Sequence, residues 1–201
     1  MSAVINKQLM KNLIILFLLL IITVSAFAQK SNYGISFGIG QADAIQRKVA
    51  GGAAYDMTTS WSVALNYGFK LNDKVELRSG ISLLTSELKQ TSKEYLDTTE
   101  TTYTKDFRML TIPFLFDYNF SRHWSFDIGI LSDCEISSST LVARQNGLGF
   151  SADFAYSFSL SKKFSLQLIP YADMHNVASF NVSGVSYKIG DAGMKMMFRT
   201  N

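Results

Sequence analysis

Apolar residues alternate with small or polar ones along most of this chain after residue 29, and this period of two constrains the fold more than any other feature. The alternation occupies eight stretches: residues 33–40, 61–71, 75–83, 110–120, 124–130, 148–160, 164–168 and 191–199. Successive residues of a β-strand point to opposite faces, so each stretch predicts a strand with one apolar and one polar face. No helical pattern of comparable length follows residue 29. The sequence therefore predicts an all-β fold of eight amphipathic strands.

Short and long connections alternate between these stretches. Three connections share one pattern, three polar residues between apolar-x-apolar segments, at residues 69–77, 118–126 and 158–166. The others are longer and polar, at about residues 41–60, 89–104, 137–147 and 176–184. Short periplasmic turns that alternate with longer outer loops are typical of outer-membrane barrels. We therefore predict an eight-stranded antiparallel up-and-down transmembrane β-barrel over residues 29–201.

Aromatic side chains gather beside the short turns. They are Phe69, Tyr118, Phe120, Trp124, Phe126, Phe158, Phe164 and Phe198. Such rings prefer the lipid–water interface, so we expect a girdle at the periplasmic side of the membrane. The opposite strand face is rich in Gly, Ser and Ala, which suits a narrow lumen. These features favour a membrane barrel over the alternative, a secreted soluble lipocalin-like barrel whose apolar face surrounds a lipid ligand.

The first 28 residues have the pattern of a secretory signal peptide. Lys7 and Lys11 precede an unbroken apolar run at residues 13–24, and a small-x-small cleavage motif ends at Ala28. The run is shorter than the roughly 20 residues that a spanning helix needs, so we expect cleavage rather than a transmembrane anchor. Met10 begins a more typical signal peptide than Met1, so both are candidate start sites.

Composition excludes several classes of function. Without Lys7 and Lys11, 17 of the 19 basic residues remain against 16 acidic ones, which leaves no basic field for nucleic acid. The single cysteine, Cys134, excludes an internal disulfide and multi-cysteine metal motifs. A general porin is not expected, because open aqueous channels need roughly 16 or more strands.

One strand resembles a known family. Residues 110–120 read LTIPFLFDYNF, in which Ile112-Pro113 begins an apolar strand that closes on an aromatic residue. This resembles the corresponding strand of the PorT-like outer-membrane barrel family, and the hairpins and signal peptide agree over most of residues 29–199. The resemblance implies a small eight-stranded barrel of a family whose members mostly have no assigned activity. A founding member is linked to export of secreted proteases, but no residue here carries that role over.

The polar strand face predicts a cluster of charges in the lumen. The turn at residues 118–126 places Asp117 opposite Asp127, and Arg78 lies equally far from its own turn on the neighbouring strand. Two facing carboxylates need a cation or a shared proton, so we expect Arg78, Asp117 and Asp127 to cluster and Lys195 to join them. A proton or ion site is one interpretation. A structural plug is favoured, because eight strands leave room for little beyond their own side chains.

Asp173 and His175 are the candidate residues for a site at the outer rim. Both are expected to face inward, and a histidine with a carboxylate or serine can act as a catalytic base. The other histidine, His123, lies in a periplasmic turn, and no spacing of the carboxylates distinguishes a catalytic site from a solvated rim. We therefore expect no catalytic, cofactor-binding or metal-binding residues. Further acidic residues are expected near this rim: Asp133, Glu135 and Asp153.

These patterns predict an integral outer-membrane protein with a side-chain-filled lumen and a structural or loop-mediated binding role at the cell surface. The alternatives are a rim enzyme that acts on lipid or peptide through His175, and the soluble lipid-binding barrel. We expect a monomer without cofactor that contacts outer-membrane lipid. During biogenesis it would meet periplasmic chaperones and the barrel-assembly machinery. Phe198 is followed by Arg199-Thr200-Asn201, whereas many such barrels end on the aromatic that this machinery reads.

Overall fold

The computed structural model describes residues 31–45, 54–93, 100–137, 145–180 and 188–200, and the signal peptide expected at residues 1–28 lies outside them. The strands are β1 (Ser31–Ile45), β2 (Ala54–Met57), β3 (Thr59–Lys70), β4 (Val75–Lys93), β5 (Glu100–Asn119), β6 (Trp124–Glu135), β7 (Gly147–Ser159), β8 (Phe164–Ser179) and β9 (Lys188–Thr200). The described residues include no helix that is long and apolar enough to cross a membrane.

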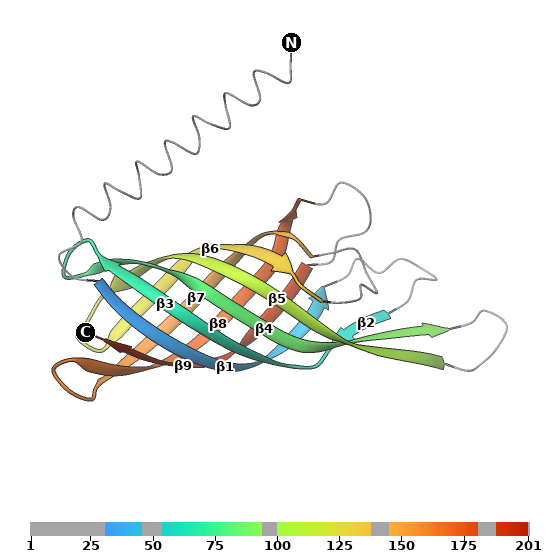
Figure 1. Cartoon of the computed structure of the whole chain (residues 1–201), viewed down its shortest axis with the longest axis horizontal. Helices are drawn as coiled ribbons and strands as arrows, with labels where there is room; N and C mark the ends of the chain where they lie inside the picture. Colours follow the sequence, from blue (N-terminus) through green and yellow to red (C-terminus); the bar gives the residue numbers. More distant parts are fainter. Residues whose placement is uncertain (1–30, 46–53, 94–99, 138–144, 181–187, 201) are drawn as a thin grey trace, which may run out of the picture. The chain divides into compact units, whose positions relative to one another are not determined.

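The sheet closes on itself. The strands follow the order β2-β4-β3-β1-β9-β8-β7-β6-β5, and a further β4–β5 pairing joins the last strand back to the start of this order (Figure 1). β2 and β3 pair with β4 in succession, because Met57 lies opposite Leu88 and Trp61 opposite Thr85. The one extra residue between them makes a β-bulge, so β2 and β3 form a single strand of the barrel. The predicted eight-stranded antiparallel barrel is confirmed.

The three short turns share one hydrogen-bonding arrangement. The side-chain oxygen of the first turn residue accepts hydrogen bonds from the backbone N–H groups two and three residues further on. These residues are Asn72, Ser121 and Ser161. Short polar side chains stabilise turns in this way. A turn of set length also sets the register of its hairpin, and Asp117 accordingly lies opposite Asp127.

The barrel has apolar side chains outside and charged ones inside. Trp61, Leu65 and Phe114 are 61%, 65% and 52% exposed, whereas Asp127 and Glu76 are 0% and 1% exposed. The expected aromatic girdle is exposed too, apart from Phe69, which is buried. Lipid solvates such an exterior and water does not. The soluble lipocalin-like alternative, which needs the apolar face inside, is therefore wrong.

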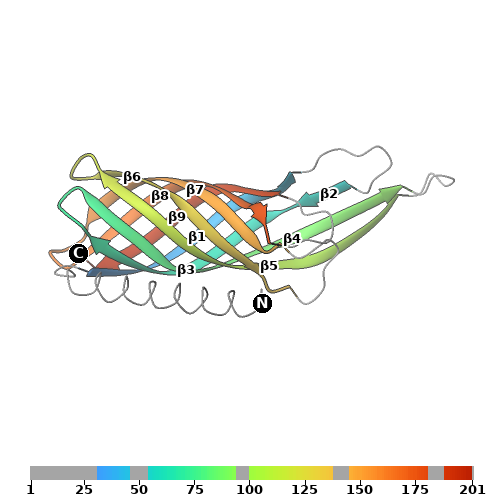
Figure 2. The same ribbon diagram turned by 90° about the horizontal axis from the view of Figure 1, so that it is seen from above.

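β4 and β5 form a hairpin that extends past the other strands at the outer end (Figure 2). They stay paired from Val75 opposite Tyr118 to Lys93 opposite Glu100, so strands occupy both ends of the loop expected at residues 89–104. The loop expected at residues 41–60 is shortened in the same way, by β1 and β2. A strand pair beyond the membrane needs no apolar face. The period of two therefore did not reveal these extensions.

An apolar cluster fills the barrel toward its outer end, where a polar lumen was expected. Its buried members are Ala42, Met57, Leu84, Leu88, Phe107, Met109 and Ile189. They lie on β1, β2, β4, β5 and β9. The lumen is therefore mostly charged between the short turns and the middle of the barrel and largely apolar above, where Glu135, opposite Met109, is also buried.

Candidate functional site

The charged part of the lumen begins next to the short turns. Arg199 Nη2 lies 2.9 Å from Glu76 Oε2, and Asn32 Nδ2 donates to the same oxygen at 3.1 Å. These contacts join β1, β4 and β9. Sequence analysis did not single out this group. The sequence feature that could have revealed it is that Glu76 and Arg199 both lie on the polar face of their strands at the same end of the barrel.

Arg78, Asp117, Asp127 and Asp153 lie in the next layer, and we call them the Arg78 cluster. Arg78 Nη2 donates to Asp127 Oδ2 and lies 3.6 Å from Asp153 Oδ2. Asp117 faces Asp127 across β5 and β6, with Asn119 Nδ2 3.3 Å from Asp117 Oδ1. All four charged residues are at most 5% exposed. Asp153, which was expected at the outer rim, belongs to this deeper layer instead, because the β6–β7 register places it opposite Asp127.

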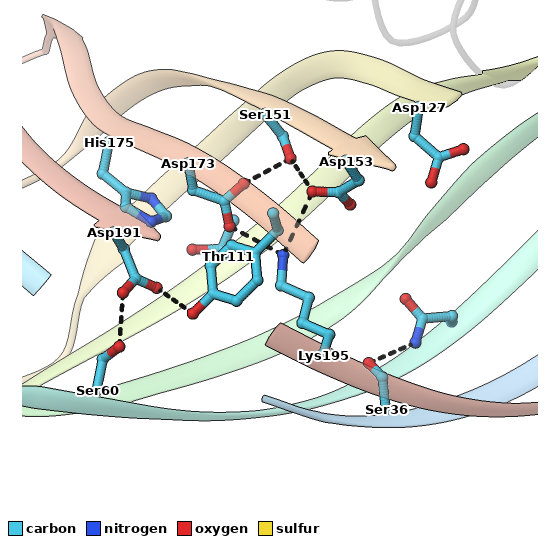
Figure 3. Close-up of polar contacts among 12 residues, drawn as sticks. Ser36, Ser60, Thr111, Asp127, Ser151, Asp153, Asp173, His175, Asp191 and Lys195 are labelled. Atoms are coloured by element: carbon cyan, nitrogen blue, oxygen red, sulfur yellow. Dashed lines mark hydrogen bonds and ion pairs between the residues drawn. The ribbon is translucent and has the colours of Figure 1, made fainter. Parts of the chain in front are cut away.

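Lys195 joins the Arg78 cluster indirectly. Its Nζ lies 3.0 Å from Asp173 Oδ2 and 3.8 Å from Asp153 Oδ1. The Ser151 hydroxyl bridges the same two carboxylates, at 2.5 Å from Asp173 Oδ1 and 3.2 Å from Asp153 Oδ1 (Figure 3). Among the described residues, the ion pairs of Lys195 reach the Arg78 cluster through Asp153 rather than through the facing pair that was expected.

His175 lies further toward the outer end and is held by Asp133. His175 Nδ1 is 3.0 Å from Asp133 Oδ1, and Thr111 Oγ1 donates to the same oxygen at 2.9 Å. The backbone N–H of Asn176 donates to Asp133 Oδ2 at 3.2 Å. His175 is 3% exposed, and its buried Nε2 has no hydrogen-bond partner among the described residues.

Asp191 completes this layer, although sequence analysis did not select it. It lies opposite Asp173 in the β8–β9 register. Ser60 Oγ donates to Asp191 Oδ1 at 2.5 Å, and the Tyr171 hydroxyl donates to Oδ2 at 2.9 Å. One ligand atom each from Asp173, His175 and Asp191 lies within 4.8 Å of the other two, so these residues are candidate metal ligands.

A bulge in β8 positions His175. The β7–β8 register shifts between Leu148 and Phe150, and Asn176, on the facing segment, has a φ of 54°. Asparagine tolerates this left-handed conformation better than most residues. As a result, His175 and Asn176 are both buried, although consecutive residues of a regular strand point to opposite faces. Sequence analysis did not mark this bulge, since Asn176 is one asparagine in a loop-like stretch.

A cavity of about 50 Å³ lies among these layers, enough for a few water molecules. Its ionisable lining residues are Arg78, Asp153, Asp173, His175, Asp191 and Lys195. Its other lining residues include Ser36, Ser62, Leu84, Leu115 and Met197. The cavity is thus walled by the lumen's own side chains.

The geometry gives little support to a rim enzyme at His175. A hydrolase of the serine–histidine kind needs a hydroxyl within hydrogen-bond distance of the imidazole. Within the described part of the chain, His175 Nε2 has no such partner and Nδ1 lies against Asp133. His175 is also almost fully buried. The described residues therefore place no serine nucleophile beside this histidine.

Solved structures share this fold, although no protein-family model matches the chain and comparison with curated proteins gives no match. The outer-membrane protein OprG from Pseudomonas aeruginosa is 11% identical, with a TM-score of 0.51, over 84% of this chain and 94% of that one. Ail of Yersinia pestis, solved with a heparin analogue, is 12% identical, with a TM-score of 0.44, over 85% and 99%. Neisserial surface protein A is 12% identical, with a TM-score of 0.44, over 86% and 99%.

At 11% identity, the likeness to OprG shows the fold alone. That fold, together with the apolar exterior, defines the class: an integral outer-membrane β-barrel. The predicted localisation agrees with this class.

Proposed function

We propose that this chain is a closed, non-conducting barrel that acts at the cell surface through its outer loops and the extended β4–β5 hairpin. The observation that carries this proposal is the filled lumen. Layers of charged side chains join the strands across the lumen between the short turns and the middle of the barrel, and the apolar cluster packs above them. The cavity among the charged layers has a volume of only about 50 Å³, which supports a closed lumen in the described part of the chain. Function then concentrates on the outward-facing segments.

The β4–β5 hairpin offers a specific binding surface. Within the described residues, β5 pairs with β6 only from Met109 onward, so residues 101–106 pair with β4 alone. An unpaired strand edge can add a strand from a partner. Tyr103 is 55% exposed on this segment, and exposed tyrosines are frequent anchors of protein interfaces. We infer an extended peptide or protein segment as the partner.

We further propose a family, an oligomeric state and partners for this chain. PorT-like membership rests on residues 110–120 and the hairpin pattern. We also propose a monomer that contacts outer-membrane lipid through its apolar band and meets periplasmic chaperones and the assembly machinery during biogenesis. A role in protease export has no residue to support it.

Conductance and surface crosslinking together test the proposal. Residues 29–201, refolded and inserted into planar bilayers, are expected to give no stable single-channel steps. In intact cells, a photocrosslinking residue at Tyr103 should give adducts that are absent when the same residue replaces Arg122 in a periplasmic turn. Regular conductance steps, or equal adducts at both positions, would contradict the proposal.

A further inference from the structure

Asp173, His175 and Asp191 converge in the outer half of the charged lumen (Figure 3). Asp173 and Asp191 face each other across β8 and β9, and His175 is two residues from Asp173 on the same strand. One ligand atom from each lies within 4.8 Å of the others. We propose that these three side chains bind one divalent transition-metal ion, of which Zn²⁺ is the simplest probe. Sequence analysis expected no metal ligand.

The imidazole of His175 is prepared for this role. Its Nδ1 lies 3.0 Å from Asp133 Oδ1, and its buried Nε2 has no hydrogen-bond partner in the part of the chain that the structure describes. A buried polar nitrogen without a partner is unfavourable. In metal sites a carboxylate commonly fixes one imidazole nitrogen while the other binds the ion. Asp133, itself held by Thr111 and the Asn176 backbone, fits the first part of that arrangement.

Both carboxylates are held in place before any ion binds. Ser60 and Tyr171 donate to the two oxygens of Asp191, at 2.5 Å and 2.9 Å. Ser151 and Lys195 contact the two oxygens of Asp173, at 2.5 Å and 3.0 Å. Each carboxylate oxygen retains a further lone pair that can bind a metal ion.

The donor set points to a class of ion. One imidazole with two carboxylates suits first-row transition ions such as zinc, whereas magnesium and calcium prefer oxygen ligands alone. The three side chains also line the cavity of about 50 Å³, which supplies room for water at the remaining coordination position.

The charge balance of the lumen favours a bound cation. The buried or nearly buried carboxylates are Glu76, Asp117, Asp127, Asp133, Glu135, Asp153, Asp173 and Asp191. Among the described residues, the ion pairs of this region supply three permanent cations, Arg78, Lys195 and Arg199. Charges buried away from water need compensation, and a divalent ion supplies it. Lys195 competes with the ion for Asp173, so its removal should strengthen metal binding.

Metal titration of the mature chain tests the proposal. Residues 29–201 are refolded in detergent without a polyhistidine tag, since refolding gives metal access to the closed lumen, and are then dialysed. We expect one zinc per chain by elemental analysis. His175→Ala and Asp191→Asn should each weaken zinc binding at least tenfold in competition with a chelating dye. Asp133→Asn should weaken it roughly 10- to 100-fold, and Lys195→Gln should tighten it.

His123 provides the matched control, because it is the other of the two histidines in the chain and lies in an exposed turn. His123→Ala should keep full zinc binding. A folded wild-type chain that retains no zinc would overturn the proposal, as would a loss of binding on His123→Ala with His175→Ala unaffected. X-ray absorption of zinc-loaded wild type is independent of variant folding. It should show nitrogen and oxygen neighbours at about 2.0–2.2 Å, and a sulfur neighbour would place the ion at Cys134 and overturn the assignment.

Discussion

Arg78 shows how single residues hold this barrel together. Its side chain is 4% exposed and extends from β4 to contact Asp127 and Asp153, which lie on β6 and β7. The two carboxylates and the guanidinium compensate one another's charges, which the barrel wall and the surrounding lipid keep away from water. Removing one partner of a buried pair costs far more than the pair contributes, since it leaves an uncompensated charge.

Arg78→Met should therefore lower the free energy of unfolding by about 3–5 kcal/mol, measured by urea titration in lipid or detergent. Arg108→Met is the matched control. Arg108 pairs with Asp106 at 3.5 Å, but its side chain is 55% exposed, so its loss should cost under about 1 kcal/mol. Adding Asp127→Asn to Arg78→Met should recover part of the loss, because it removes the orphaned charge. Equal losses for the two arginine variants would contradict a structural role for the buried cluster.

Residue-level prediction from the sequence worked where a turn sets the register. Asp117 and Asp127 face each other because the turn between them has a set length, and the sequence contains that information. The neighbours of Lys195 depend on the relative heights of strands that no short turn joins, so its contact with the cluster through Asp153, rather than through Asp117 and Asp127, could not be predicted from the sequence. Asp191 was missed for the same reason, because residues 180–187 separate β8 from β9.

At the scale of elements, the β4–β5 hairpin differs from the rest of the barrel. Beyond Leu83 and Leu110 its two strands continue to Lys93 and Glu100, mostly with exposed polar side chains on β5. Such a ribbon depends on its own cross-strand pairs, for example Thr91 and Thr102, whose hydroxyls lie 3.5 Å apart. The barrel wall does not depend on the tip.

Replacing residues 92–101 with Asn-Gly should leave the barrel folded. Thr91 and Thr102 would then be joined by a two-residue turn suited to a hairpin. We expect the unfolding free energy to change by less than about 1 kcal/mol, since solvent-exposed tips tolerate such changes. A chain that no longer folds would show that the tip is part of the structural core.

The sequence predicts the strands well where the membrane requires alternating apolar and polar residues, and less well elsewhere. Pro113 and Pro170 attract attention in the sequence as strand breakers, yet both stay in register, opposite Leu131 and Met194. The register shift of β8 occurs near Asn176 instead, where the backbone turns left-handed. Nothing in the alternation marks that position, because the bulge is stabilised by contacts with Asp133 from another strand.

Across the whole barrel, the distribution of side chains is the reverse of that in a soluble protein, with apolar side chains outside and charged ones inside. Large apolar side chains such as Trp61 and Leu65 are exposed, and Asp127 and Asp117 are buried. A closed sheet satisfies the backbone within lipid, the apolar exterior contacts the acyl chains, and the charges pair inside. The same arrangement leaves the lumen filled and directs function to the outer segments and to the His175 site.

Gel migration before and after boiling tests most directly whether the apolar side chains lie outside a closed barrel. Residues 29–201 are refolded in detergent and compared, boiled and unboiled, on a denaturing gel, with circular dichroism alongside. The account predicts a β-type spectrum and an unboiled band that migrates differently from the boiled one, because the closed barrel resists the gel detergent at room temperature. A chain that folds in plain buffer and shows no shift on boiling would contradict it, since the apolar face would then have to lie inside.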